Sequence, residues 1–166
     1  MAQRDTLSTR QRASGSESVA ARCRPIIRNA DPRCLASYVP IRSEIDPSAM
    51  LREARADGRV LALPAITGPT AIVFRRWVPG ESLIGGRFGT RAPALSAPIV
   101  EPDLILLPLV AFDRSGTRLG YGRGFYDRAI AALHARGMRG TSCTEKAIPT
   151  SGGRRPRAWS AAMARS

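Results

Sequence analysis

The stretch Asp103-Leu-Ile-Leu-Leu-Pro-Leu-Val-Ala-Phe-Asp113 decides the fold, and a glycine-rich segment follows it closely. Its apolar run is too short and too interrupted by proline to span a membrane, and it is typical of a strand buried on both faces. We therefore predict that it forms the central strand of a sheet. The next residues, Asp113-Arg-Ser-Gly116, are typical of a turn, because aspartate bonds its own backbone and glycine adopts positive φ.

Three glycines alternate at positions 120, 122 and 124 of the segment Arg118-Leu-Gly-Tyr-Gly-Arg-Gly-Phe-Tyr-Asp127. Apolar residues then recur every four positions, at Phe125, Ala129 and Leu133, so a helix is predicted to begin where the glycines end. A strand, a glycine-rich loop and a helix N-terminus in that order form an anion site, because backbone N–H groups and the positive end of the helix dipole converge there. The glycine spacing matches neither a Walker A motif nor a dinucleotide-binding fingerprint. Phosphate is the expected ligand.

Charged residues flank this loop. Arg118 and Arg123 are able to neutralise phosphate oxygens in bidentate fashion, and Asp127 in the first helical turn is able to hold a Mg²⁺ that bridges phosphates. A plainer interpretation stays open, in which the glycines only make a turn, the arginines are solvated and Asp127 favours the helix dipole. The flanking charges favour the phosphate interpretation.

The segment Leu107 to Arg128 resembles the signature of the 5-formyltetrahydrofolate cyclo-ligase family, also called methenyltetrahydrofolate synthetases. The resemblance continues upstream in Ala36-Ser-Tyr-Val-Pro-Ile-Arg-Ser-Glu-Ile45, in Val60-Leu-Ala-Leu-Pro64 and in Gly86-Arg-Phe-Gly89, and it covers roughly residues 35 to 135. It implies an enzyme that uses ATP and Mg²⁺ to convert 5-formyltetrahydrofolate to 5,10-methenyltetrahydrofolate, with release of ADP and phosphate.

The resemblance also implies roles for individual residues. Arg118 and Arg123 are the implied catalytic residues, and Asp127 is the implied metal ligand. The residues implied to bind ATP are Arg118, Leu119, Gly120, Tyr121, Gly122, Arg123, Gly124, Phe125 and Tyr126. The residues implied to bind the folate are Val39, Glu44, Tyr121, Gly122, Arg123, Gly124 and Phe125.

Glu44 is the most informative acid outside the loop. A carboxylate accepts two N–H bonds from a flat aminopyrimidinone such as a pterin, whereas the plain alternative is a solvated loop carboxylate. The resemblance favours the pterin interpretation. Phe88 and Trp77 are able to wall the same site, but the core interpretation is favoured for both aromatic side chains.

Strands and helices alternate along the chain, which indicates an α/β fold. Strands are expected at Cys34 to Val39, at Val60 to Pro64 and at Ala71 to Phe74. The whole pattern, with the resemblance, predicts a three-layer α/β/α sandwich with a mainly parallel sheet that is incomplete at its C-terminal end. Ligands of such sheets collect at the carboxyl ends of the strands, where both Glu44 and the glycine loop are expected.

Two helices are predicted before the central strand. The first runs from Ser16, as its N-cap, to about Asn29 and is interrupted by Pro25, while residues 1 to 15 are expected to lie outside it. The second starts at Asp46 as N-cap with Pro47 at N1, buries Met50, Leu51 and Ala54, and ends at Gly58.

Composition limits the remaining functions. The formal charge of +13 and the pI near 11.4 are typical of nucleic-acid-binding proteins, but only Lys146 among the 26 basic residues is a lysine and aromatic residues make up 5%. We interpret the charge as a bias toward arginine and give nucleic acid a low prior. The cysteines Cys23, Cys34 and Cys143 have no spacing typical of zinc or disulfide frameworks, and no signal or membrane segment is visible. A cytoplasmic monomer without a membrane partner is expected.

The chain changes character beyond about Arg136. Residues 137–166 are rich in Gly, Pro, Ser and Arg and contain no Asp, so they are expected to form a basic, disordered tail beside one cyclo-ligase-like domain at 1–136, whose first 30 residues match the family poorly. A shifted reading frame is our hypothesis for this change. Three alternatives therefore stay open: an active cyclo-ligase, an impaired fragment of one, and a basic nucleic-acid-binding protein.

Overall fold

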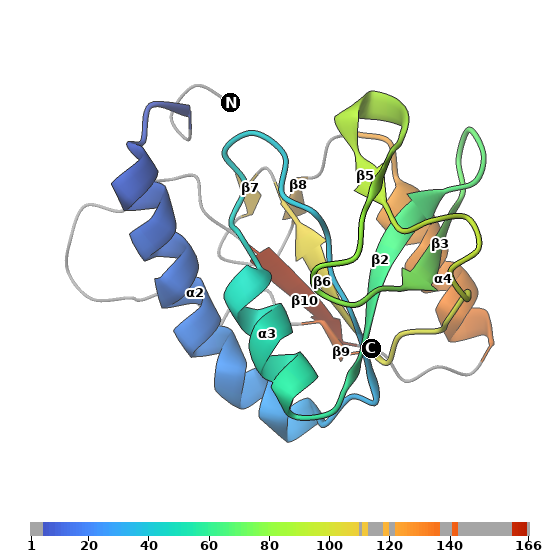
Figure 1. Ribbon diagram of the computed structural model, residues 1–166, viewed down its shortest axis with the longest axis horizontal. Helices are drawn as coiled ribbons and strands as arrows, with labels where there is room; N and C mark the ends of the chain where they lie inside the picture. The colour runs from blue at the N-terminus through green and yellow to red at the C-terminus, as the bar shows by residue number, and fades with distance from the viewer. Residues whose placement is uncertain are drawn as a thin grey trace.

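The computed structural model describes residues 5–109, 111–112, 118–119, 122–136, 141–142 and 161–165 (Figure 1). The helices are α2 (Thr9–Ala30), α3 (Ser48–Ala56) and α4 (Phe125–Ala135), with a 3₁₀ turn at Arg87–Gly89. The strands are β1 (Cys34–Ala36), β2 (Val60–Ile66), β3 (Ile72–Arg76), β4 (Ile84–Gly85), β5 (Arg91–Ala92), β6 (Leu104–Pro108), β7 (Ala111–Phe112), β8 (Arg118–Leu119), β9 (Thr141–Ser142) and β10 (Ala161–Arg165).

The main sheet has the strand order β10-β9-β6-β1-β2-β3, with a further pairing of β10 to β6. β1 runs parallel to both β2 and β6, and β6 runs parallel to β9. β3 and β10 pair antiparallel with their neighbours. The predicted mainly parallel α/β sheet is therefore confirmed, and β6 lies in its interior as the apolar run predicted.

Side chains alternate between the two faces of the sheet, as the period of a strand requires. Leu35, Leu61, Leu104 and Leu106 join the core cluster under α2 and α3. The intervening residues join a second cluster under α4, which includes Ala36, Ala62, Ile105, Leu107 and Leu133. Figure 1 shows α2 and α3 side by side and α4 across the sheet from them. The three predicted layers are present.

The N-terminal helix begins earlier than predicted. Ser8, and not Ser16, is the N-cap of α2: its side chain accepts from the Gln11 backbone and the Gln11 side chain accepts from the Ser8 backbone, which together form a capping box. Pro25 lies inside the helix and does not end it. The buried residues Val19, Ala20, Cys23 and Ile27 form one face, and their packing offsets the cost of proline.

The second predicted helix is confirmed with a shift of its cap. α3 starts at Ser48 with Pro47 at the N-cap position, one residue later than predicted. The Asp46 carboxylate still accepts a 2.9 Å bond from the Ser48 backbone N–H. Met50, Leu51 and Ala54 are buried as predicted. Gly58 follows the helix with a φ of +80°, a conformation that favours glycine.

Several strand boundaries differ from the predictions. β1 ends at Ala36 and not at Val39, β2 extends to Ile66, and β3 is shifted to Ile72–Arg76. The long apolar run also divides: β6 stops at Pro108, and Ala111–Phe112 pairs with Arg118–Leu119 in a two-stranded hairpin. Proline lacks the N–H that would continue the ladder, which explains the break. The predicted turn at 113–116 lies outside the described residues.

Two segments of the expected tail lie in the sheet. Thr141–Ser142 pairs with β6 and β10, and Ala161–Arg165 pairs antiparallel with β6 and β9. The structure therefore describes these two segments of the expected tail as strands whose backbones pair with β6. The remaining residues of 137–166 lie outside the described part of the chain.

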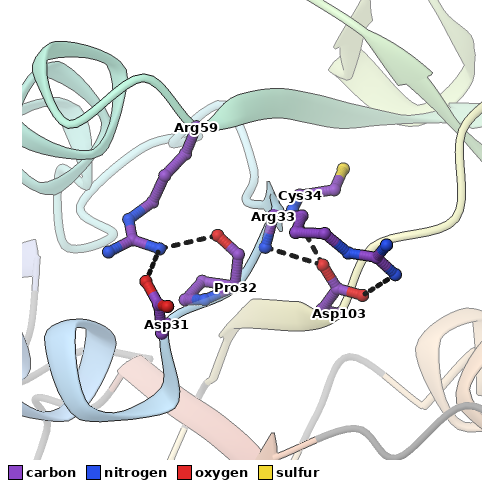
Figure 2. A network of polar contacts seen from close by, with 6 residues as sticks. All are labelled: Asp31, Pro32, Arg33, Cys34, Arg59 and Asp103. Carbon is purple, nitrogen blue, oxygen red and sulfur yellow. Dashed lines mark hydrogen bonds and ion pairs between the residues drawn. The ribbon is translucent and has the colours of Figure 1, made fainter.

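A polar network joins the N-terminal ends of the central strands (Figure 2). One oxygen of Asp103 accepts bonds of 2.8 and 2.9 Å from the backbone N–H groups of Arg33 and Cys34, and the other lies 3.9 Å from the Arg33 guanidinium. Arg59, just before β2, donates to the Asp31 carboxylate at 2.9 Å and to the Pro32 carbonyl at 2.7 Å. These contacts connect the starts of β6, β1 and β2.

Candidate active site

The candidate site is built at the opposite edge of the same strands. β1 and β6 are parallel, so the segments that leave their carboxyl ends start from one edge of the sheet. After β1 the chain passes through Tyr38 to the loop that carries Glu44. After β6 it passes through the β7–β8 hairpin to the glycine loop and α4.

Glu44 is buried, with 8% of its surface exposed, so the interpretation as a solvated loop carboxylate is wrong. Its Oε2 accepts a 2.8 Å bond from the Ile41 backbone N–H, which folds the loop back on itself. The buried Tyr38 hydroxyl donates to the Ile45 carbonyl at 2.9 Å. These two bonds fix the backbone on both sides of the Glu44 carboxylate.

The start of the chain also holds this loop. The Ser16 hydroxyl in α2 accepts a 3.0 Å bond from the Asp46 backbone N–H. The Ser43 hydroxyl bonds to the Asp5 carboxylate. Ser16, predicted to be an N-cap, and Asp5 therefore brace the loop that presents Glu44.

Glu44 and α4 lie close together, as their electrostatics show. Burial raises the pKa of the Tyr126 phenol well above its ordinary value, and the Glu44 charge is the second cause. Burial also raises the pKa of Tyr38, with the charge of Glu44 as the next cause. Tyr126 is half-buried and packs against the core cluster under α4. The acid loop and the first turn of α4 thus share one site.

The described part of the glycine loop has the backbone that the glycines predict. Gly122 has a φ of +79°, and Gly124 has a φ of +60° and is the N-cap of α4. The conformation of Gly124 favours glycine, and a Cβ there would lie 2.9 Å from Nη1 of Arg128, so a larger residue would displace this guanidinium. The helix starts at Phe125 as predicted; Gly120 and Tyr121 lie outside the described residues.

Arg128 is a part of the site that sequence reasoning missed. Its Nε donates to the Thr70 carbonyl at 2.8 Å, and its Nη2 donates to the Arg123 carbonyl. Its guanidinium also lies 5.8 Å from the centre of the Phe125 ring. The residue stood within the recognised segment, but its role depends on a contact 58 positions away in the chain, and no local pattern signals that contact.

Arg123 stacks on Phe88. The guanidinium carbon lies 3.7 Å from the ring centroid, and the Phe88 and Phe125 rings lie 6.5 Å apart. Phe88 is 47% exposed, so the prediction that it belongs to the core is wrong, whereas Trp77 packs against the core cluster beneath α2 and α3. The 3₁₀ turn carries Phe88 to the glycine loop.

Asp127 lies in the first turn of α4 and is exposed. A single carboxylate suits Mg²⁺, which keeps several waters and is commonly held by one or two carboxylates together with substrate phosphates. Among the described residues, no group of three or more His, Cys, Asp or Glu side chains gathers at one place. The donor set therefore fits a Mg²⁺ carried by phosphates and does not fit a cage made of protein alone.

The remaining predicted residues are placed as follows. Val39 is half-buried between β1 and the Glu44 loop. Arg118 and Leu119 form β8 and lie in a strand instead of the predicted loop; the structure describes only their backbone. No helix in the described ranges has the length and apolar character needed to cross a bilayer.

A three-layer α/β sheet with a glycine-rich segment and a buried acid at its carboxyl edge places the chain among α/β proteins of the kind that bind ligands at that edge. The chain belongs to the 5-formyltetrahydrofolate cyclo-ligase family, whose model matches residues 1–148. This match is wider than the stretch of 35 to 135 that the motifs indicated, and it includes the N-terminal residues expected to match poorly.

Individual relatives agree. The chain is 30% identical over 133 residues to a 5-formyltetrahydrofolate cyclo-ligase of Haemophilus influenzae, which covers 76% of this chain and 71% of that protein. It is 37% identical over 107 residues to one of Mycolicibacterium smegmatis, which covers 59% of this chain and 55% of that protein. Among solved structures, the 5,10-methenyltetrahydrofolate synthetase of Aquifex aeolicus superposes with a TM-score of 0.64 at 32% identity, over 77% of this chain and 66% of that one. The chain thus spans between about half and about seven tenths of the relatives that it matches.

Proposed function

We propose that this protein catalyses the ATP-dependent cyclisation of 5-formyltetrahydrofolate to 5,10-methenyltetrahydrofolate. The γ-phosphoryl group passes to the formyl oxygen on N5, N10 of the same folate attacks the activated carbon, and the phosphate leaves with that oxygen. An amide oxygen is a poor leaving group, and phosphorylation makes it a good one. No protein nucleophile is needed, so the protein acts by positioning and by neutralising charge.

The proposed roles follow the two segments of the site. Glu44 accepts N–H bonds from the pterin, with Val39 as an apolar contact. The glycine-loop amides, the N-terminus of α4 and the guanidinium groups of Arg118 and Arg123 bind the phosphates. Bound Mg²⁺, held through Asp127, would neutralise charge on the transferred phosphoryl group.

One observation carries this proposal: β1 and β6 are parallel neighbours, so the loop with Glu44 and the segment that leads to α4 leave the same edge of the sheet. The effect of the Glu44 charge on Tyr126, in the first turn of α4, agrees with this arrangement. A folate whose pterin ring meets Glu44 would therefore place its N5 side beside the helix terminus at which phosphates bind. Glu44 and Tyr126 lie 82 positions apart in the sequence, and this arrangement supports the proposal that the pterin and phosphate sites adjoin.

The test is turnover of 5-formyltetrahydrofolate by the full chain with ATP and Mg²⁺, followed by the growth of methenyl absorbance and by ADP release. We expect methenyl product and ADP in equal amounts, and we expect the formation of both to require Mg²⁺ and ATP. Phosphate release without methenyl product would overturn the folate assignment.

A family member with impaired turnover is the second candidate. Such a protein would bind ATP and folate but would turn them over slowly. Equilibrium binding of a non-hydrolysable ATP analogue and of 5-formyltetrahydrofolate separates the two candidates: binding without turnover supports the impaired family member, and binding with turnover supports the enzyme.

A further inference from the structure

The contact between Phe88 and Arg123 joins two segments that are separate in the sequence. The guanidinium carbon lies 3.7 Å from the ring centroid, which is the separation of a stacked pair. Arg87 lies on the same ring at 5.3 Å, and the Phe125 ring stands 6.5 Å away. Phe88 thus stands at the centre of a cluster of two arginines and one further aromatic ring.

The backbone of Phe88 is set for this contact. Its φ is +62° and its ψ is +26°, a left-handed conformation that a phenylalanine seldom adopts. Three bonds at the turn hold it: the Gly86 N–H donates to the Thr90 carbonyl at 2.8 Å, and both the N–H and the hydroxyl of Thr90 donate to the Arg87 carbonyl. The turn directs a large apolar ring outward, where 47% of it is exposed, instead of into the core.

The other end of Arg123 is fixed as well. The Arg128 guanidinium donates to the Arg123 carbonyl and, through Nε, to the Thr70 carbonyl at 2.8 Å. The backbone of Arg123 is therefore held by Arg128, and its side chain is held by Phe88.

We propose that Phe88 is a positioning residue that holds the Arg123 guanidinium ready to receive phosphate oxygens. The N–H donors of a guanidinium lie in its plane, so a ring that covers one face leaves the donors at the edge able to bind an oxyanion. An aromatic ring carries no charge, so the cation keeps its full charge for the ligand. This inference rests on the proposed function of the loop and adds to it a residue from the turn before β5.

Lysine would not serve in the same way. Its ammonium carries the charge on a flexible stem and cannot stack as a flat fork. Arg123→Lys, which keeps the charge, should therefore bind phosphate less tightly than the parent protein. This loss should be present only while Phe88 is there to stack on the guanidinium.

The experiment uses Phe88→Leu, Arg123→Lys, the double variant and Ile84→Ala in the full chain. Ile84, 44% exposed on β4, is a matched control for loss of exposed apolar surface in the same hairpin. We measure kcat and KM for ATP, the Kd of a non-hydrolysable ATP analogue, and the ¹H–¹⁵N order parameter of Arg123 Nε.

We expect each single variant to weaken analogue binding by about two- to fivefold, the range of an exposed stacked pair. The double variant should bind the analogue no more weakly than the single variant with the lower affinity, because both changes remove the same contact. Phe88→Leu should also lower the Nε order parameter, while Ile84→Ala leaves both readouts unchanged. Effects that multiply in the double variant, or an Nε that stays equally ordered without the ring, would overturn the proposal. If the parent chain fails to turn over folate but Nε loosens in Phe88→Leu, the proposed function fails and the positioning role stands.

Discussion

The two edges of the parallel strands use arginine differently. At the N-terminal edge, Arg59 pairs with the Asp31 carboxylate and Arg33 with Asp103 (Figure 2). At the carboxyl edge, Arg123 stacks on the Phe88 ring and Arg128 bonds to backbone carbonyls. A carboxylate cancels a cation, whereas a ring or a carbonyl leaves the net charge in place. This difference supports the proposal that the carboxyl edge receives an anionic ligand, while the pairs at the N-terminal edge stabilise the fold.

The acidic residues at the two edges also have different surroundings. Asp103 accepts from two backbone N–H groups at the strand starts. Glu44 is buried beside two tyrosines whose pKa values its charge raises. Substituting each acid should therefore change a different property: activity for Glu44 and stability for Asp103.

The largest expected effect is that of Glu44→Gln on activity. Glutamine has the same shape and keeps an acceptor for the Ile41 N–H, but it removes the charge proposed to bind the pterin. Loss of a charged hydrogen bond predicts a fall in kcat/KM for 5-formyltetrahydrofolate of about 10- to 100-fold. Steady-state kinetics with saturating ATP measure it. The KM for ATP should change far less, and a rise in the KM for ATP as large as that for 5-formyltetrahydrofolate would place Glu44 outside the folate half of the site.

The next effect is that of Asp103→Ala on stability. The change leaves the backbone N–H groups of Arg33 and Cys34 without their acceptor, so we expect a loss of about 2 kcal/mol in the free energy of unfolding. Urea unfolding measures it. Asp103→Asn is the matched control, because its amide oxygen still accepts, and it should lose less than half as much. Activity per folded molecule should not change; a loss of kcat in both variants would contradict the separation of the two edges.

Alkaline pH should destabilise the protein through groups at both edges. Burial first, and then the charge of Asp103, raises the pKa of the Cys34 thiol from 9.0 to about 11. The unfolded thiol loses its proton near pH 9 while the folded one keeps it, so stability is complete below pH 9 and falls as the pH rises toward 11. Because the pKa values of Tyr38 and Tyr126 are also raised, the stability of the protein should fall further above pH 10.

Urea midpoints measured across this pH range test the prediction. Cys34→Ala should reduce the slope between pH 9 and 11, because one of the groups with a raised pKa is gone. Glu44→Gln should lower the absorbance titration midpoints of Tyr38 and Tyr126, since the neighbouring charge no longer opposes phenolate. A stability that is flat to pH 11 would show that these groups titrate normally.

The sequence predicted local features of the site well. The apolar run predicted β6, and the glycines with the four-residue period predicted the start of α4, because both signals depend on neighbouring residues. The N-terminus of α2 was missed although Ser8 and Gln11 form a local capping box, because the arginine-rich stretch around them carries little apolar periodicity.

Contacts across the chain were not predictable. The burial of Glu44, the stack of Phe88 on Arg123 and the bond from Arg128 to Thr70 each depend on how distant segments pack. The sequence likewise indicated only that Asp103 is the first residue of a strand. Its role as an acceptor depends on Arg33 and Cys34, which are 70 and 69 positions away in the sequence but lie beside it in the fold. Residue types allowed these contacts, and the topology of the sheet decided them.

The smallest expected effect concerns a third arginine pair, on the exposed faces of α2 and α3. Two Arg24 nitrogens each lie 2.6 Å from a Glu53 oxygen, but both side chains are about 40% exposed. Solvent screens such a pair, so Glu53→Gln should shift the urea midpoint only slightly, and the shift should shrink as salt is added. Asp103→Ala supplies the comparison, because the loss of backbone acceptors hardly depends on salt. Glu53→Gln could instead cost as much stability as Asp103→Ala. In that case any paired carboxylate would stabilise the protein equally, and the position of Asp103 at the strand starts would have no special role.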